Sequence, residues 1–168
     1  MSQVRSVVVM AGGTGGHVFP GLAVADALRA QGVSVHWLGT STGIEAELVP
    51  ARQIPISFLN VSGLRGQGIA RLLAAPFKLI IAVVAAMQVL KKVKADAVIG
   101  LGGYVTGPGG VAAWLMGKPV FIHEQNAVAG FTNRQLSRFA YKVLEAFPRA
   151  FPASEKVQQT GNPVRADI

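Results

Sequence analysis

Ala11-Gly12-Gly13-Thr14-Gly15-Gly16-His17 joins an apolar run at residues 4–10 to a helix-like segment at residues 18–30. The run is continuous and rich in valine, which is typical of a buried parallel strand. A glycine turn between a strand and a helix leaves backbone N–H groups unpaired and presents the positive end of the helix dipole, about half a charge. The stretch therefore predicts a site for a phosphate, a diphosphate or a developing anion.

Short apolar runs alternate with helical segments along the rest of the chain. We expect strands at residues 4–10, 33–38, 55–60, 96–101, 119–123 and 141–146, and helices at residues 18–30, 45–48 and 108–116. A last helix is expected after Asn126, through Asn133, Arg134 and Arg138. Pro55 opens the third strand, which favours a position near a sheet edge. We expect residues 147–168, with three prolines, to be a connector. The alternation predicts an α/β fold with a parallel sheet flanked by helices, and 168 residues suit one domain.

A second glycine loop resembles the first. Residues 98–103 form a strand end that runs into Gly102-Gly103, and more glycine and a helix follow. Two such loops at the carboxyl ends of parallel strands are expected to line one crevice, where open α/β sheets bind ligands.

The first loop lacks the motifs of common nucleotide sites. A dinucleotide fingerprint starting at Gly13 requires glycine where Val18 stands, and a P-loop requires lysine where His17 stands. Asp26, Asp96 and Asp167 lie far apart in the chain, so metal chemistry is poorly supported. We therefore predict neither a cofactor nor a metal ion.

The three histidines receive different predictions. A helix N-terminus disfavours the imidazolium, so His17 is expected to be a neutral ring that can act as a general base. His36 lies inside a strand and is expected to be packed there. His123 ends a strand beside Glu124 and is expected to be an orienting residue.

The charge balance predicts an anionic partner. Sixteen Lys and Arg stand against eight Asp and Glu, which gives a net charge of +8. The region at residues 68–94 is both apolar and cationic, with Pro76 as a kink or a fresh helix start. Its uncharged stretch, residues 79–90, is much shorter than the roughly 20 residues of a membrane-spanning helix.

Three interpretations of this region are open. It is the solvated face of a core helix, a nucleic-acid surface or a membrane surface. Nucleic-acid binding lacks interleaved aromatic residues, since Phe77 stands alone. Docking on an anionic membrane fits best, through Leu72, Leu73, Phe77, Ile80, Arg71 and Lys78.

Four motifs carry a resemblance to a known family. They are Gly12-Gly13-Thr14-Gly15-Gly16-His17-Val18-Phe19-Pro20-Gly21-Leu22-Ala23, Gly102-Gly103-Tyr104-Val105-Thr106-Gly107-Pro108, His123-Glu124-Gln125-Asn126-Ala127-Val128-Ala129-Gly130 with Asn133-Arg134, and Thr160-Gly161-Asn162-Pro163-Val164-Arg165. With these motifs in order, the sequence resembles the MurG family of glycosyltransferase family 28. These bacterial enzymes transfer N-acetylglucosamine from UDP-GlcNAc to lipid I and make lipid II in peptidoglycan synthesis.

The resemblance implies the N-terminal, acceptor-side half of a GT-B fold, a Rossmann-like parallel sheet flanked by helices. It also implies an inverting, metal-independent transfer, with roles for particular residues. These are His17 as the general base, Thr14, Gly15 and Gly16 beside the donor and the acceptor diphosphate, Tyr104, Glu124 and Asn126 facing the cleft, and Arg165 reaching the donor. The cationic apolar region matches the family's membrane-docking patch. The implied location is peripheral, on the cytoplasmic face of the bacterial inner membrane, where undecaprenyl-linked lipid I is the acceptor.

The resemblance also implies a domain division. We expect residues 1–162 to form the acceptor- and membrane-binding domain and residues 163–168 to begin an interdomain linker, with the C-terminal domain that binds most of UDP-GlcNAc absent from this sequence. The isolated chain is then expected to fold but to turn over little or nothing. Two alternatives stay open: a non-catalytic membrane-surface module that binds a lipid diphosphate, and a generic nucleotide-binding protein.

Overall fold

The computed structural model describes residues 4–61 and 69–164, with side chains described from residue 75 onward in the second range. Within these residues, one parallel sheet has the strand order β3-β2-β1-β4-β5-β6-β7. The strands are β1 (Ser6–Ala11), β2 (Ser34–Gly39), β3 (Ile56–Phe58), β4 (Ala97–Gly102), β5 (Val120–Glu124), β6 (Lys142–Glu145) and β7 (Val157–Gln159). The winding reverses at β1, which lies between β2 and β4. This is the switch point at which open α/β sheets bind ligands.

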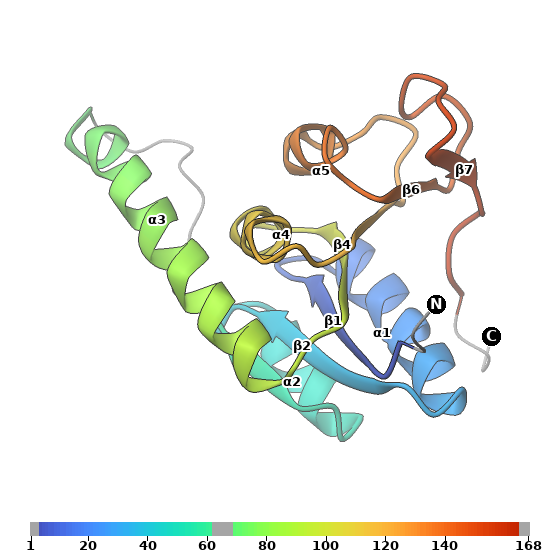
Figure 1. The fold of residues 1–168 in the computed structure, drawn as a ribbon, viewed down its shortest axis with the longest axis horizontal. Helices are drawn as coiled ribbons and strands as arrows, with labels where there is room; N and C mark the ends of the chain where they lie inside the picture. Colours follow the sequence, from blue (N-terminus) through green and yellow to red (C-terminus); the bar gives the residue numbers. More distant parts are fainter. Residues whose placement is uncertain (1–3, 62–68, 165–168) are drawn as a thin grey trace.

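Helices cover both faces of the sheet (Figure 1). They are α1 (Gly15–Ala30), α2 (Glu45–Ala51), α3 (Ile69–Lys92), α4 (Thr106–Leu115) and α5 (Phe131–Leu136). α1 and α2 pack on one face, and α3, α4 and α5 pack on the other. The predicted α/β fold with a parallel sheet between helices is confirmed.

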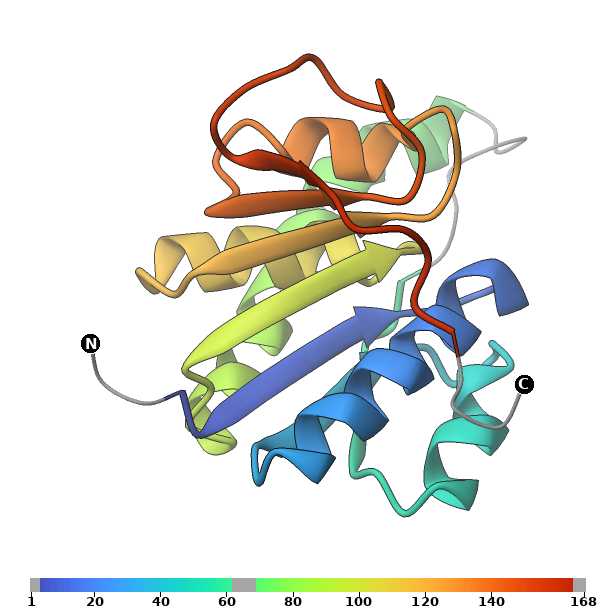
Figure 2. The same ribbon diagram turned by 90° about the vertical axis from the view of Figure 1, so that its right-hand side faces the viewer.

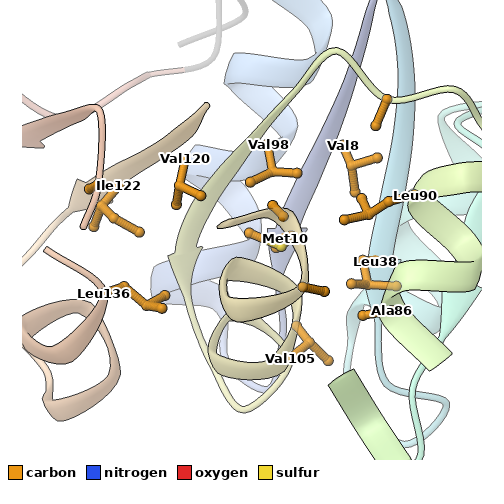
Figure 3. Close-up of a cluster of buried hydrophobic side chains, with 14 of the residues drawn as sticks. Val8, Met10, Leu38, Ala86, Leu90, Val98, Val105, Val120, Ile122 and Leu136 are labelled. Atoms are coloured by element: carbon orange, nitrogen blue, oxygen red, sulfur yellow. The ribbon is translucent and has the colours of Figure 1, made fainter. Parts of the chain in front are cut away.

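Each face of the sheet has its own apolar core. Val8, Met10 and Val98 point toward α3 and α4, where Leu90 and Val105 meet them (Figure 3). On the opposite face, Val7, Val9, Ala11, Leu22 and Trp37 belong to a second cluster under α1 and α2. Alternate residues of β1 therefore serve opposite faces, as the two-residue period of a strand requires, and both are apolar because both faces are covered.

The structure bears out the predicted strands, with ends shifted by one or two residues, and it places β3 at the sheet edge as Pro55 suggested. The helices differ more: α2 extends to Ala51, and α4 begins at Thr106, two residues before the expected start. α1 begins at Gly15, because the Thr14 carbonyl accepts the N–H groups of His17 and Val18 at 3.1 Å each. α3 is one helix through Pro76, so a fresh helix start there is wrong.

The connector expected after residue 146 contains a strand. β7 extends the sheet by pairing in parallel with β6, in the register Val143↔Val157. Three residues with one apolar side chain gave too little pattern to be predicted as a strand. α5 is also shorter than expected, since it begins only at Phe131 and ends at Leu136, before Arg138.

Candidate active site

The two glycine loops lie against each other at the carboxyl ends of β1 and β4, the edge crossed by the C-terminal segment in Figure 2. A Cβ atom on Gly103 would stand 2.4 Å from the carbonyl oxygen of Gly12, so the two backbones are in direct contact. Gly103 also has φ +87°, a conformation that side chains disfavour. The structure thus brings together the two loops that the sequence pattern paired.

His17 lies in the first turn of α1, half-buried between the second glycine loop and the β5–α5 loop. A Cβ on Gly102 would meet the imidazole at 2.6 Å, so only glycine leaves room for the ring in this position. On the other side, His17 Nδ1 lies 3.1 Å from Gln125 Oε1. Gly102 and Gln125, both far from His17 in the sequence, therefore fix the position of its ring.

The start of α1 is accessible to a ligand, since the Glu45 carboxylate bonds to Gly13 ahead of the helix and not to its first turn. Thr14 precedes the helix in an extended conformation and its side chain makes no capping hydrogen bond, while the first turn holds no acidic residue. Thr14 and Gly16 are exposed, and Gly15 is half-buried. The N–H groups of this turn are thus suited to an anion.

An open pocket of about 450 Å³ lies beside this turn. Its lining residues are Gly16, Phe19, Pro20, Gln125, Asn126, Asn162, Pro163 and Val164. Of the sequence-predicted substrate residues, Gly16 and Asn126 meet here. Tyr104 is exposed on the β4–α4 loop and does not line this pocket, and Arg165 lies outside the described residues.

Glu124 does not line the pocket, so the prediction that it faces the cleft is wrong. Its side chain is 1% exposed. Oε1 accepts the backbone and side-chain N–H groups of Asn126 at 3.1 and 2.9 Å. Oε2 accepts from the Gly130 backbone at 3.1 Å and from Asn133 Nδ2 at 2.9 Å. The carboxylate thus organises the β5–α5 loop and orients Asn126 toward the pocket.

Sequence reasoning gave no role to Glu45, which supports the first glycine loop. Its buried carboxylate accepts the Gly13 N–H at 3.0 Å, and the Thr40 N–H and hydroxyl at 2.8 and 2.7 Å. Burial alone raises the pKa of Glu45, but these hydrogen bonds outweigh it and hold the pKa below the ordinary 4.5. The charged carboxylate therefore ties α2 to the loop before α1.

Glycines make room for Glu45. Cβ atoms on Gly12, Gly39 and Gly43 would stand 2.6, 2.7 and 2.1 Å from its side chain. The one signal in the sequence was the pair of glycines, Gly39 and Gly43, shortly before Glu45. Nothing local indicated that this glutamate reaches the first loop.

His36 bonds to Ser57 on β3, with Nε2 2.9 Å from Oγ, in keeping with the packing role expected for it. Among the described residues, no three His, Asp or Glu side chains gather in a cluster that could hold a metal ion.

One stretch of α3, residues 76–81, is exposed around the circumference of the helix. Residues 76–81 are all exposed, with Phe77 at 70% and Ile80 at 60%, whereas Ala82, Ala86 and Leu90 further along are buried. Figure 1 shows this end of α3 extending beyond the other helices. Lys78 lies in the same exposed stretch. Arg71, Leu72 and Leu73 belong to α3, but their side chains lie outside the described ones. No helix in residues 4–61 and 69–164 is long and apolar enough to cross a membrane.

Comparison with known proteins agrees with this arrangement. The model of the glycosyltransferase family 28 N-terminal domain matches residues 7–145. A protein from Aeromonas hydrophila, named UDP-N-acetylglucosamine--N-acetylmuramyl-(pentapeptide) pyrophosphoryl-undecaprenol N-acetylglucosamine transferase, is 57% identical over 98% of this chain and 45% of its own length. A protein of the same name from Acinetobacter baumannii is 60% identical over 99% of this chain and 46% of its own length.

A solved structure agrees as well. The crystal structure of Acinetobacter baumannii MurG matches with a TM-score of 0.83 and 60% identity, over 95% of this chain and 46% of that one. The chain therefore spans about half the length of the curated relatives it matches. Because the family model covers most of the chain and the fold agrees with that of a 60% identical relative, the chain belongs to glycosyltransferase family 28 and carries the N-terminal domain of that family.

Proposed function

We propose that this chain is the acceptor-side domain of an inverting, metal-independent glycosyltransferase that moves GlcNAc from UDP-GlcNAc to lipid I and forms lipid II. The observation that carries the proposal is the 57–60% identity, over nearly the whole chain, to transferases whose name states this donor sugar and an undecaprenyl-linked acceptor. The geometry supports it, since a histidine, a free helix start and a pocket meet at the switch point of the sheet.

The chemistry assigns His17 the role of base. The ring nitrogen that does not face Gln125 takes the proton of the acceptor hydroxyl while the hydroxyl oxygen bonds to the anomeric carbon of GlcNAc. The bond from that carbon to the UDP oxygen breaks, and UDP leaves with the electron pair. Attack opposite the leaving group inverts the anomeric centre. A well-placed base contributes roughly 10²- to 10⁴-fold to the rate.

The surrounding residues supply binding. Thr14, Gly15 and Gly16 hold phosphate oxygens at the start of α1, where backbone N–H groups and the helix dipole favour negative charge. Asn126 contacts the substrate from the pocket, with Glu124 behind it, and Tyr104 contributes from the second glycine loop. Arg165 reaches the donor.

The partial coverage of the relatives supports a division of labour between two domains. Residues 1–162 form the acceptor- and membrane-binding domain and residues 163–168 begin the linker. The remaining half of the relatives' length supplies most of the UDP-GlcNAc site. Strong UDP-GlcNAc binding by this chain alone would contradict this division.

The end of α3 that carries the exposed residues 76–81 docks on an anionic membrane. Phe77 and Ile80, with Leu72 and Leu73, insert into the interface, and Arg71 and Lys78 add about 1 kcal/mol each near anionic lipid. The protein is then peripheral, on the cytoplasmic face of the bacterial inner membrane, where a lipid-linked acceptor is presented beside the pocket.

The test joins this chain to the remaining half of the Acinetobacter baumannii relative and assays GlcNAc transfer to lipid I, in wild type and in His17→Ala. We expect the variant to lose about 10²- to 10⁴-fold in rate, with His36→Gln as the matched control that keeps activity. An undiminished rate in His17→Ala removes His17 as the base. A wild-type hybrid that binds vesicles but transfers nothing favours a non-catalytic lipid-diphosphate module instead.

A further inference from the structure

Two side chains, those of Gln125 and His123, link His17 to the C-terminal segment. His17 Nδ1 lies 3.1 Å from Gln125 Oε1, and Gln125 Nε2 lies 3.1 Å from His123 Nδ1. His123 Nε2 then lies 3.0 Å from the carbonyl oxygen of Gly161. These hydrogen bonds form one continuous series, in which the pair furthest apart in sequence, His17 and Gln125, is separated by 108 positions.

Backbone carbonyls determine the direction of every hydrogen bond in this series. Gln125 Nε2 also lies 3.1 Å from the carbonyl oxygen of His123. A carbonyl oxygen only accepts, so the amide NH₂ must face His123 and the amide oxygen must face His17. The Gly161 carbonyl likewise requires a proton on His123 Nε2, which leaves Nδ1 of that ring as an acceptor for Gln125.

Burial favours the same arrangement. His123 is 2% and Gln125 is 7% exposed, so water does not compete for these bonds. Burial lowers the pKa of His123 below 6.5, against weaker opposing effects of the Gly161 carbonyl and the Glu124 charge. A neutral His123 is the form that accepts at Nδ1. One arrangement of protons therefore satisfies all the partners.

We propose that Gln125 is a positioning residue that holds His17 in the tautomer with the proton on Nδ1, so that Nε2 is the nitrogen that takes the acceptor proton. The catalytic role of this tautomer rests on the proposed function, whereas the presence of the tautomer is independent of it. His123 holds the amide in place, and the carbonyl of Gly161 holds His123.

The tautomer is read directly on this chain by labelling histidine with ¹⁵N and recording two-bond ¹H–¹⁵N correlations near neutral pH. We expect His17 in the wild type to carry its proton on Nδ1. Gln125→Met keeps the side-chain length but removes the acceptor, and we expect His17 to shift toward the other tautomer. Gln125→Glu restores an acceptor oxygen and is expected to restore the Nδ1 proton.

His36 is the internal control, since its bond to Ser57 is independent of Gln125, and unchanged His36 signals report an intact fold. A wild-type His17 protonated on Nε2 overturns the proposal. So does a Gln125→Met variant in which His17 keeps the proton on Nδ1.

Activity of the hybrid enzyme separates this proposal from the proposed function. Gln125→Met is expected to lower kcat roughly 10-fold or more while KM for the acceptor changes less than about twofold, and Gln125→Glu is expected to recover part of the loss. If the hybrid transfers GlcNAc and Gln125→Met leaves kcat unchanged, the positioning role is wrong and the proposed function stands. If wild type transfers nothing, the proposed function falls, and the ¹⁵N spectra still decide the tautomer.

Discussion

Gly102 and His17 are in contact at the centre of the site: a methyl group on Gly102 would stand 2.6 Å from Cε1 and Nδ1 of the imidazole. Gly102 also has φ +118°, which other residues adopt only with strain. The backbone of one glycine loop therefore forms the surface on which the histidine of the other loop rests.

Gly102→Ala is expected to displace the His17 ring and to destabilise the fold by about 1–3 kcal/mol. Urea unfolding of this chain measures the stability, and the hybrid assay is expected to show at least a roughly 10-fold loss of transfer. Gly117→Ala is the matched control, because Gly117 has φ +65° with nothing within 4 Å of its Cβ position. It is expected to cost about 1–2 kcal/mol and leave transfer intact. Equal transfer in both variants would contradict the contact.

Glu45→Gln is expected to lower the free energy of unfolding by about 1–3 kcal/mol. The amide NH₂ group would face an N–H donor of Gly13 or Thr40, so one buried donor would lose its acceptor. Glu47→Gln, on the exposed face of the same helix, should change the stability by less than about 0.5 kcal/mol. Urea unfolding near neutral pH compares the two variants, and equal values would remove the supporting role of Glu45.

Acid is expected to lower the free energy of unfolding in two pH ranges. Burial lowers the pKa of both His123 and His36 below 6.5, with the charge of Lys92 adding to the effect at His36. Below about pH 6.5 the unfolded chain binds protons that the folded chain does not bind. The contribution of the two histidines to the free energy of unfolding is therefore fully present above this pH and falls as the pH drops. Glu45 has a folded pKa below 4.5, so its contribution is lost as pH falls further through that folded pKa.

Urea unfolding as a function of pH checks this behaviour. The decline between neutral pH and about pH 5 should be shallower in His123→Gln and in His36→Gln than in the wild type. Glu45→Gln should keep that decline and flatten the curve at lower pH. A wild-type stability that rises on acidification from neutral pH would show that the sign is wrong.

Removing apolar side chains from α3 is expected to weaken membrane binding without affecting the fold. Phe77 and Ile80 are largely exposed, so the double change to Ala should leave the stability within about 0.5 kcal/mol. Partial insertion of both side chains is worth about 2 kcal/mol or more, so binding to vesicles containing phosphatidylglycerol should fall about 30-fold. Sedimentation with such vesicles measures it. Phe58→Ala, an exposed aromatic residue on β3, is the control, and an equal loss there would reject α3 as the docking surface.

The sequence by itself determined the α/β class, most strand positions, the edge position of β3 and the pairing of the two glycine loops. These features follow from local patterns: valine-rich runs, glycine turns at strand ends and a proline at the start of a strand. The position of His17 at the start of a helix was also predictable, because it is a local feature. The family of the chain followed from the same motifs.

Only the tertiary structure decided what holds that site together. Glu45 reaches Gly13 across 32 positions, and Gln125 reaches His17 across 108. Both contacts form because parallel strands bring their carboxyl ends to one edge of the sheet, where loops distant in sequence meet. β7 was missed for a related reason, since three residues with one valine form a strand only when β6 lies beside them. Side-chain hydrogen bonds between such loops leave no periodic pattern in the sequence, so they appear only when the sheet is assembled.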